Sequence, residues 1–476
     1  PAFVALVKGG GLTWLQYEVA VPLAMIFIMV FLLPLFRKLE LISVYEYLEL
    51  RFDSATRSLL AAVFLFSRGL GTGVGVYASA IPISVALHLD LSVTILAIGI
   101  ITLIYDTIGG MKAVVYSDVL QMVILLLGIA LCITYAVEDM GSWGAVLQAH
   151  DARRFVVFDF GTGLFDGARY PFWGFLVGGF FLYASYYGAD QSQAQRELST
   201  PNLAHTKYSL IFNGFARLPL TVAYVVMGLA VGAVFIQNPD AIEKITLGGQ
   251  VKPDRMIPTF VLDYLPHGVI ALIFSAILAA SMSSLDSALN SLSAATMQDF
   301  IDRYAPGLMT TPKRQMWIGK LTTVAWGFVI IAFAFALGDA ESVVVLINKV
   351  GSAFYGPILA TFVIGVTLRR VGGKAMIAGI VAGVGANVFL WLSFDEALFW
   401  MWWNMTGAIV SAFVALGASL VFPQVSDLSS RGVVLWDTDI WRNEGRWVPA
   451  YGLLLAYFGG ILWILSRLPR WLTPAG

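Results

Sequence analysis

Residues 279–287 read AASMSSLDS and lie inside an apolar run, 264–299, that is long enough to cross a bilayer. Hydroxyls and carboxylates supply the oxygen ligands that hard cations such as sodium prefer. At helical spacing Ser283 and Ser287 share one face, and Ser284 lies beside them. Small residues also favour close helix packing in membranes, so this stretch alone fits packing as well as it fits a cation site.

The composition of the whole chain is that of an integral membrane protein. Of its 476 residues, 58% are hydrophobic and only 12% are charged, whereas a soluble domain carries about 25% charged residues. The net charge of −1 gives no basic field for nucleic acid. A single cysteine, Cys132, excludes a disulfide framework. The histidines are too far apart in sequence to suggest a metal cluster; they are His88, His150, His205 and His267.

The apolar runs predict twelve complete transmembrane helices in a single membrane domain. They span approximately 15–36, 57–87, 91–109, 113–137, 171–196, 205–236, 264–299, 316–337, 342–367, 374–395, 399–421 and 449–467. Residues 1–10 are interpreted as the tail of an earlier helix, because the chain opens at Pro1 without a Met or a complete first span. The sequence is therefore interpreted as N-terminally truncated. Two longer polar loops, 138–170 and 237–262, are the material expected outside the membrane.

Lys and Arg concentrate in alternate loops. The richer set lies in and around 37–57, 112, 196–207, 303–314, 369–374 and 431–446. By the positive-inside rule these loops are predicted to be cytoplasmic. The expected location is a plasma membrane, specifically a bacterial inner membrane.

Several charged residues fall inside the predicted spans. A charge at the bilayer centre costs about 2.5–3.5 kcal/mol on insertion scales, so such residues are functional candidates. Pairing with one another, or reaching toward a helix end, is the structural alternative. The candidates are Glu18, Arg68, Asp118, Arg217, Asp286 and Lys349.

Two further stretches join the first one. Residues 109–121 read GGMKAVVYSDVLQ, residues 191–196 read QSQAQR, and Asp299 follows the 279–287 run. In this order and spacing the chain resembles the sodium:solute symporter family over essentially its whole length. The resemblance implies an all-α membrane protein, a multi-span helical bundle with inverted five-helix repeats and a LeuT-like core.

The same resemblance implies how the chain divides. A first repeat covers about 1–137 and a second about 171–367, with additional spans over about 374–467. Glycines 69–75 contain a GxGxxG-like pattern, but it lies inside a span and reads as a helix-packing stripe.

For sodium, the resemblance implies a site made by the carbonyl of Ala280 and the hydroxyls of Ser283 and Ser284. Its two remaining ligands would be carbonyls of a first core helix that precedes Pro1. Sodium is the expected coupling ion.

A further sodium site in some relatives would match Asp118 with Ser283, Asp286 and Ser287. Asp286 stands where those relatives carry a hydroxyl. Its carboxylate strengthens cation binding in one interpretation. In the other it pairs with a cation; the candidates are Arg68, Arg217 and Lys349.

The sugar-transporting members are similar at the expected substrate residues Tyr17, Glu18, Tyr183, Tyr186, Tyr187, Arg217 and Asn348. Tyr186 matches their inner aromatic gate, and Phe3, Tyr17 and Val344 match the outer one. Tyr187 replaces a tryptophan, Tyr183 an asparagine, Arg217 a lysine and Asn348 a glutamine. An arginine suits a carboxylate or a polyhydroxylated solute. The stretch from residues 77–80 (YASA) to Ser117 and Asp118 also resembles the branch that moves monocarboxylates, vitamins and iodide, so a carboxylate and a sugar or polyol both stay open.

The sequence therefore predicts sodium-coupled symport of a small organic solute into the cell by alternating access. The expected partners are the solute, sodium and the lipid bilayer, with no nucleic acid and no obligate protein partner. The alternatives are a transporter-like sensory module and a sodium-conducting channel. An enzyme is not expected, because the sequence shows no His/Cys/Asp constellation with catalytic spacing.

Overall fold

Long apolar helices make up most of the structure. The computed structural model describes residues 1–41, 43–108, 111–167, 169–336, 343–394, 397–424, 432–437 and 440–472. In these ranges nine helices are long and apolar enough to span a membrane, and two shorter apolar helices accompany them. The long elements are α2 (Val21–Phe27) with α3 (Leu33–Lys38), α5 (Ser54–Leu87), α6 (Leu91–Ile108), α7 (Met111–Asp139), α11 (Leu203–Gln237), α14 (His267–Thr296), α16 (Pro312–Ala336), α17 (Val343–Thr367), α18 (Gly373–Phe394), α19 (Trp402–Ala418) and α20 (Val448–Leu472).

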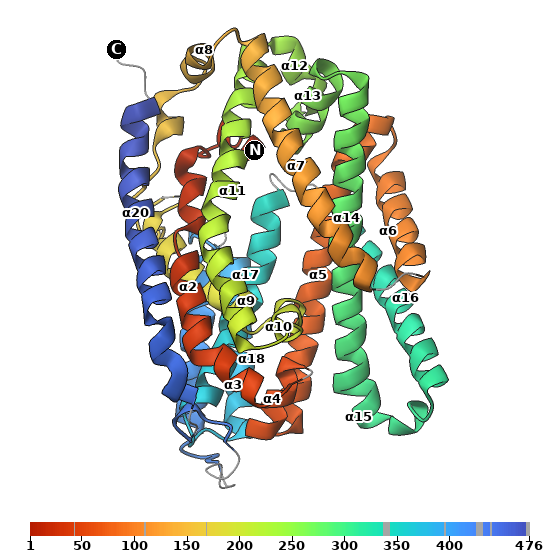
Figure 1. The fold of residues 1–476 in the computed structure, drawn as a ribbon, viewed down its shortest axis with the longest axis vertical. Helices are drawn as coiled ribbons and strands as arrows, with labels where there is room; N and C mark the ends of the chain where they lie inside the picture. Colours follow the sequence, from red (N-terminus) through yellow and green to blue (C-terminus); the bar gives the residue numbers. More distant parts are fainter. Residues whose placement is uncertain are drawn as a thin grey trace.

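Short elements cap the two ends of the bundle. At one end lie α8 (Trp143–Gln148), α12 (Pro239–Lys244), α13 (Met256–Tyr264) and the hairpin of β1 (Thr246–Leu247) and β2 (Gln250–Val251). At the other end lie α3, α4 (Val44–Arg51) and α15 (Asp302–Tyr304) (Figure 1). Loops 37–57 and 138–170 thus lie at opposite ends, as the alternation of Lys and Arg predicts. We call the α3–α4–α15 end the basic end.

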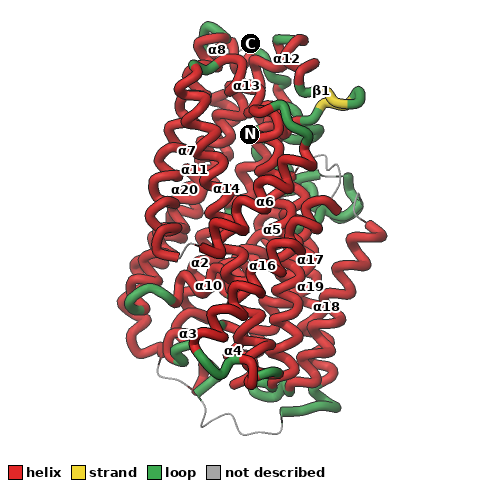
Figure 2. The backbone as a smooth tube through the Cα atoms, turned by 90° about the vertical axis from the view of Figure 1, so that its right-hand side faces the viewer, coloured by secondary structure: helices red, strands yellow, loops and turns green. Residues whose placement is uncertain are grey.

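Two groups of helices pack around a central one. The helices α5, α6, α14 and α16 pack together as one group, and α2, α9 (Gly179–Gly188) and α11 form another. Between them runs α17, which contacts α5 and α9 and also packs on α18 and α19. In the apolar 18-residue segment of α17, 83% of the residues are buried inside the protein. In the corresponding segment of the helix that contains α20, only 17% are buried. Figure 2 shows these long helices running along one common axis. α17 is therefore the core of the bundle, and α20 lies at its margin.

The predicted single helix 171–196 is wrong, because the structure breaks it. A π-helical turn at Gly174–Gly178 leads into α9, and a separate helix α10 (Gln191–Leu198) follows. Ala189 leaves the helical conformation, with φ −136°. Asp190 caps α10, since its carboxylate accepts a 2.8 Å hydrogen bond from the backbone N–H of Ser192. This cap lets the chain start a new helix in the middle of an apolar run.

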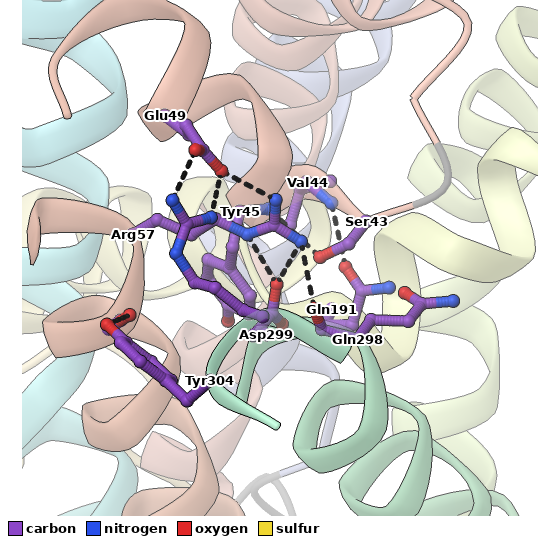
Figure 3. A network of polar contacts seen from close by, with 11 residues as sticks. Ser43, Val44, Tyr45, Glu49, Arg57, Gln191, Gln298, Asp299 and Tyr304 are labelled. Atoms are coloured by element: carbon purple, nitrogen blue, oxygen red, sulfur yellow. Dashed lines mark hydrogen bonds and ion pairs between the residues drawn. The ribbon is translucent and has the colours of Figure 1, made fainter. Parts of the chain in front are cut away.

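A network of charges ties the basic end together (Figure 3). Arg57 of α5 pairs with Asp299 at 2.6 Å and with Glu49 of α4 at 2.9 Å. Arg303 hydrogen-bonds both oxygens of Glu49 and holds the pKa of that carboxyl below its usual range. The backbone N–H of Val44 donates to Gln191 Oε1 at 2.9 Å. The short helix α4 therefore connects α5, the end of α14 and α10.

Replacing Asp299 by asparagine should destabilise the fold strongly. The carboxylate is fully buried against Arg57, and removing one partner of a buried pair costs about 3–5 kcal/mol. We expect the thermal unfolding midpoint in detergent to fall by several degrees. The matched control is Asp302→Asn, a substitution of an exposed carboxylate three residues away. Equal midpoints for the two variants would contradict a stabilising role of this network.

Candidate functional site

A cavity of about 640 Å³ lies between the two helix groups. Its wall combines aromatic rings, two guanidinium groups and several hydroxyls. The polar and aromatic residues of the wall include Tyr17, Arg68, Tyr183, Tyr186, Asp190, Arg217, Ser284, Asn348 and Tyr355, and Ala280 lies beside them. They come from the 3-10 helix Leu12–Glu18, from α5, α9, α11, α14 and α17, and from the break before α10. Helix-broken, mid-bundle cavities of this kind are where secondary transporters bind their cargo.

Five of the seven predicted substrate residues line this cavity. They are Tyr17, Tyr183, Tyr186, Arg217 and Asn348. The Tyr17 hydroxyl donates to Asn348 Oδ1 at 2.7 Å, which joins the start of the α2 span to α17. Asn348 Nδ2 in turn donates to the Val344 carbonyl at 2.7 Å. The two remaining residues, Glu18 and Tyr187, lie behind the wall rather than in it.

Glu18 and Arg217 form one buried unit. Arg217 Nε lies 3.1 Å from Glu18 Oε2. The carboxylate also accepts hydrogen bonds from the Tyr183 hydroxyl at 2.9 Å and from Thr221 Oγ1 at 3.0 Å. Glu18 is 4% exposed, whereas the Arg217 side chain keeps 32% of its surface accessible. The side of this pair that faces the cavity is therefore the guanidinium.

A series of aromatic rings leads from Tyr17 in the cavity wall to Phe3 near the N-terminus. Phe3 contacts Trp14 with ring centroids 4.6 Å apart, and Trp14 stacks on Tyr17 at 5.1 Å. Phe3 also meets the edge of Tyr170 at 4.8 Å. The predicted outer-gate residues Phe3 and Tyr17 are thus joined through Trp14, a residue that the sequence analysis missed. Val344 instead keeps an exposed side chain and contributes its carbonyl.

A second set of rings surrounds Tyr186, which lines the same cavity. Tyr186 packs edge-on against Tyr187 at 5.0 Å and against Tyr355 at 6.0 Å. Gln193 Nε2 donates to the Tyr186 hydroxyl at 2.9 Å. The predicted inner-gate residue is therefore attached to α10, and Tyr355 is a further ring that sequence reasoning did not single out.

The predicted cation ligands of α14 are partly open to the cavity. Ala280 and Ser284 line it, and Ser283 is buried beside them. Ser284 is exposed, and within the described part of the chain its hydroxyl makes no hydrogen bond. A hydroxyl oxygen free in a membrane-embedded cavity is available to a hard cation.

The described residues of the predicted second cation site do not line the cavity as Ala280 and Ser284 do. The side chain of Asp118 lies outside the described residues, as do Gly109 and Gly110. Asp286 is buried and accepts a 3.0 Å hydrogen bond from Asn290 Nδ2, and no described Lys or Arg pairs with it. Of the three cations considered as its partners, Arg217 pairs with Glu18 at 3.1 Å, and Arg68 interacts electrostatically with Asp190. Ser287 Oγ accepts a hydrogen bond from Arg196, a contact that the sequence analysis did not foresee.

The fold is that of a multi-span helical membrane protein with a cavity between its helix groups. The chain belongs to the sodium:solute symporter family, whose model matches residues 3–385. The family predicted from the sequence is confirmed by this match, and the relatives are named as transporters, not enzymes.

Named relatives fit the same family. Human sodium-coupled monocarboxylate transporter 1 is 29% identical over 371 residues, which cover 77% of this chain and 59% of that protein. The sodium/sialic acid symporter NanT of Aliivibrio fischeri is 27% identical over 391 residues, with 81% and 75% covered. The human sodium/iodide cotransporter is 29% identical over 372 residues, with 77% and 56% covered. The chain thus spans about six tenths of the length of the monocarboxylate transporters that it matches.

One solved structure shows the same fold. A substrate-bound, outward-open Na⁺-coupled sialic acid symporter superposes with a TM-score of 0.72 at 22% identity, and 88% of each chain is covered. The helical membrane fold expected from the resemblance is confirmed by this match. The repeat boundaries and the individual site residues stay predictions.

Proposed function

We propose that this protein moves a small organic solute across the membrane by sodium-coupled symport. The observation that carries the proposal is that candidate ion and solute ligands line one cavity between two helix groups. Ala280 and Ser284 supply cation ligands, and Arg217, Tyr17 and Asn348 supply solute contacts. Sodium at the α14 hydroxyls and solute at α11 and α17 would then both bias the same rocking of the two groups.

The solute class that this site suits best is a carboxylate. Glu18 already accepts three donors, from Arg217, Tyr183 and Thr221, and has little capacity left for sugar hydroxyls. Arg217 uses Nε for Glu18 and reaches the Tyr183 hydroxyl with Nη2 at 3.4 Å. Its other N–H groups remain as donors of a permanent cation, which suits a carboxylate. The relatives named for monocarboxylates and sialic acid carry acids. The sugar alternative is therefore the weaker one.

Uptake assays separate these classes. We expect labelled monocarboxylates, and not neutral sugars, to accumulate in proteoliposomes under an inward sodium gradient. Replacing Arg217 with glutamine should reduce carboxylate uptake by about a hundredfold, because a charge-assisted bidentate contact is lost. Unchanged carboxylate uptake by a folded Arg217→Gln protein would contradict the assignment.

The number of coupled ions is proposed to depend on Asp286. A potential of about 100 mV and a tenfold gradient together contribute about 3.7 kcal/mol per sodium, or a factor of roughly 500 in the accumulation ratio. A monocarboxylate carries one negative charge inward against the potential, so one coupled sodium supports only about tenfold accumulation. A second sodium would multiply that ratio by roughly 500. We expect Asp286→Asn to lower the steady-state accumulation ratio toward the one-ion limit, as measured with labelled solute at fixed potential. Asn290→Ala is the control, since it removes the donor to this carboxylate and leaves the carboxylate itself in place. A ratio that stays the same in Asp286→Asn would assign the residue a structural role.

The proposed location is a bacterial plasma membrane with the basic end in the cytoplasm. The Lys and Arg bias supports this orientation. One of the matched relatives is bacterial.

A further inference from the structure

Residues 191–196 supply none of the proposed sodium or solute ligands. They form most of α10, a short helix that packs against α14. From this helix Arg196 donates a hydrogen bond through Nη2 to Ser287 Oγ. The Arg196 side chain is exposed, and none of the described carboxylates forms an ion pair with it. A permanent cation is therefore held on α14 by a neutral hydroxyl.

The position of this contact relates it to the cation ligands. Ser287 lies one helical turn after Ser283 and on the same face. α14 runs from the α13 end toward the basic end (Figure 1), so Ser287 lies on the basic-end side of the pair Ser283 and Ser284. A sodium ion that leaves those hydroxyls along this face of α14 toward the basic end passes the contact between Arg196 and Ser287. The Arg196 side chain is exposed, so it repels a cation mainly at short range, where water screens the interaction least.

α10 is held so that Arg196 keeps this position. Gln191 at its start accepts from the backbone N–H of Val44. Past its end, Arg37 hydrogen-bonds the Thr200 carbonyl at 2.5 Å. Gln193 links it to the Tyr186 ring in the cavity. The break before α10 supplies a hinge at which the helix can change direction without unwinding α9.

We propose that Arg196 is the gate on the basic-end side of the cation path. While it is bonded to Ser287, the cation at Ser283 and Ser284 is retained, and its release requires α10 to carry Arg196 away. In this state the Ser287 hydroxyl accepts the hydrogen bond from Arg196 and does not bind sodium. Sodium binding at the second cation site and the contact between Arg196 and Ser287 therefore exclude each other. The proposal builds on sodium-coupled symport but assigns the residue that prevents uncoupled sodium flow.

The test measures efflux of radioactive sodium from proteoliposomes that contain the full-length protein and no solute. We expect Arg196→Gln to accelerate this leak by about tenfold, since both the charge and the contact with Ser287 are lost. Arg196→Lys keeps the charge and should leak little more than the parent protein. Ser287→Ala removes only the acceptor and should give an intermediate leak. Arg314→Gln is the control, because Arg314 is an exposed arginine near the same end.

The outcomes separate the gate from the symport proposal. A leak in Arg196→Gln equal to that of Arg314→Gln, with equilibrium solute exchange intact, would overturn the gate and leave symport standing. A raised leak in Arg196→Gln and not in Arg196→Lys would support the gate even where no tested solute is carried. A raised leak in Arg196→Lys as large as in Arg196→Gln would contradict the role of charge.

Discussion

Replacing Ser284 with alanine is expected to lower the apparent sodium affinity of uptake strongly. Ser284 lies in the cavity wall with a hydroxyl that makes no hydrogen bond among the described residues. A sodium ion there would lose one of its few oxygen ligands. We expect the sodium concentration for half-maximal uptake to rise by about a hundredfold, the scale of losing one charge-assisted contact. Initial rates of labelled solute uptake against sodium concentration measure this shift.

The matched control is Ser291→Ala on the same helix. The Ser291 hydroxyl donates to the Ser287 carbonyl at 2.9 Å and lies two turns from Ser284. This control should keep nearly the parental sodium dependence. Should both alanine variants respond alike, the sodium site would not lie at Ser284, and the hydroxyls of α14 would serve helix packing.

Replacing Glu18 with glutamine is expected to give the second large effect, on stability. Its carboxylate is buried with Arg217 and with hydroxyl donors. Loss of the negative charge leaves the guanidinium uncompensated, at a cost of about 3–5 kcal/mol. Thermal unfolding in detergent should show a clear fall of the midpoint.

The double variant Glu18→Gln/Arg217→Gln distinguishes the charge pair from simple packing. Removing both charges together should recover most of the lost stability, because no unpaired buried charge remains. It should not recover carboxylate uptake, which needs the cation of Arg217. A double variant no more stable than Glu18→Gln would show that the two residues act independently.

The position of the α14 hydroxyls was predictable from the sequence because helical spacing is local. Hydroxyls at helical spacing inside an apolar run identify a face, and the structure places Ser284 of that face in the cavity wall. The long helices were predictable for the same reason, since length and hydropathy decide a span. The cap at Asp190 was visible in principle, because an Asp before a polar helix is an N-cap signal.

Contacts between distant segments were not predictable in the same way. Glu18 and Arg217 are 199 residues apart, and the sequence named both among charges that could pair in the membrane without indicating that they pair with each other. Trp14 bridges Phe3 and Tyr17 only because a 3-10 helix brings the rings together. Arg196 belongs to a recognised motif, yet its partner Ser287 follows from packing between α10 and α14. Side-chain pairing of this kind depends on tertiary geometry that no spacing rule contains.

The most direct test uses the full-length protein in proteoliposomes with a panel of labelled carboxylates, amino acids and sugars. Uptake is measured with an imposed inward sodium gradient and again after an ionophore has collapsed it. We predict that at least one small carboxylate accumulates above equilibrium only while the gradient exists. A folded preparation that shows no sodium-stimulated uptake of any panel member would contradict sodium-coupled symport of a small carboxylate.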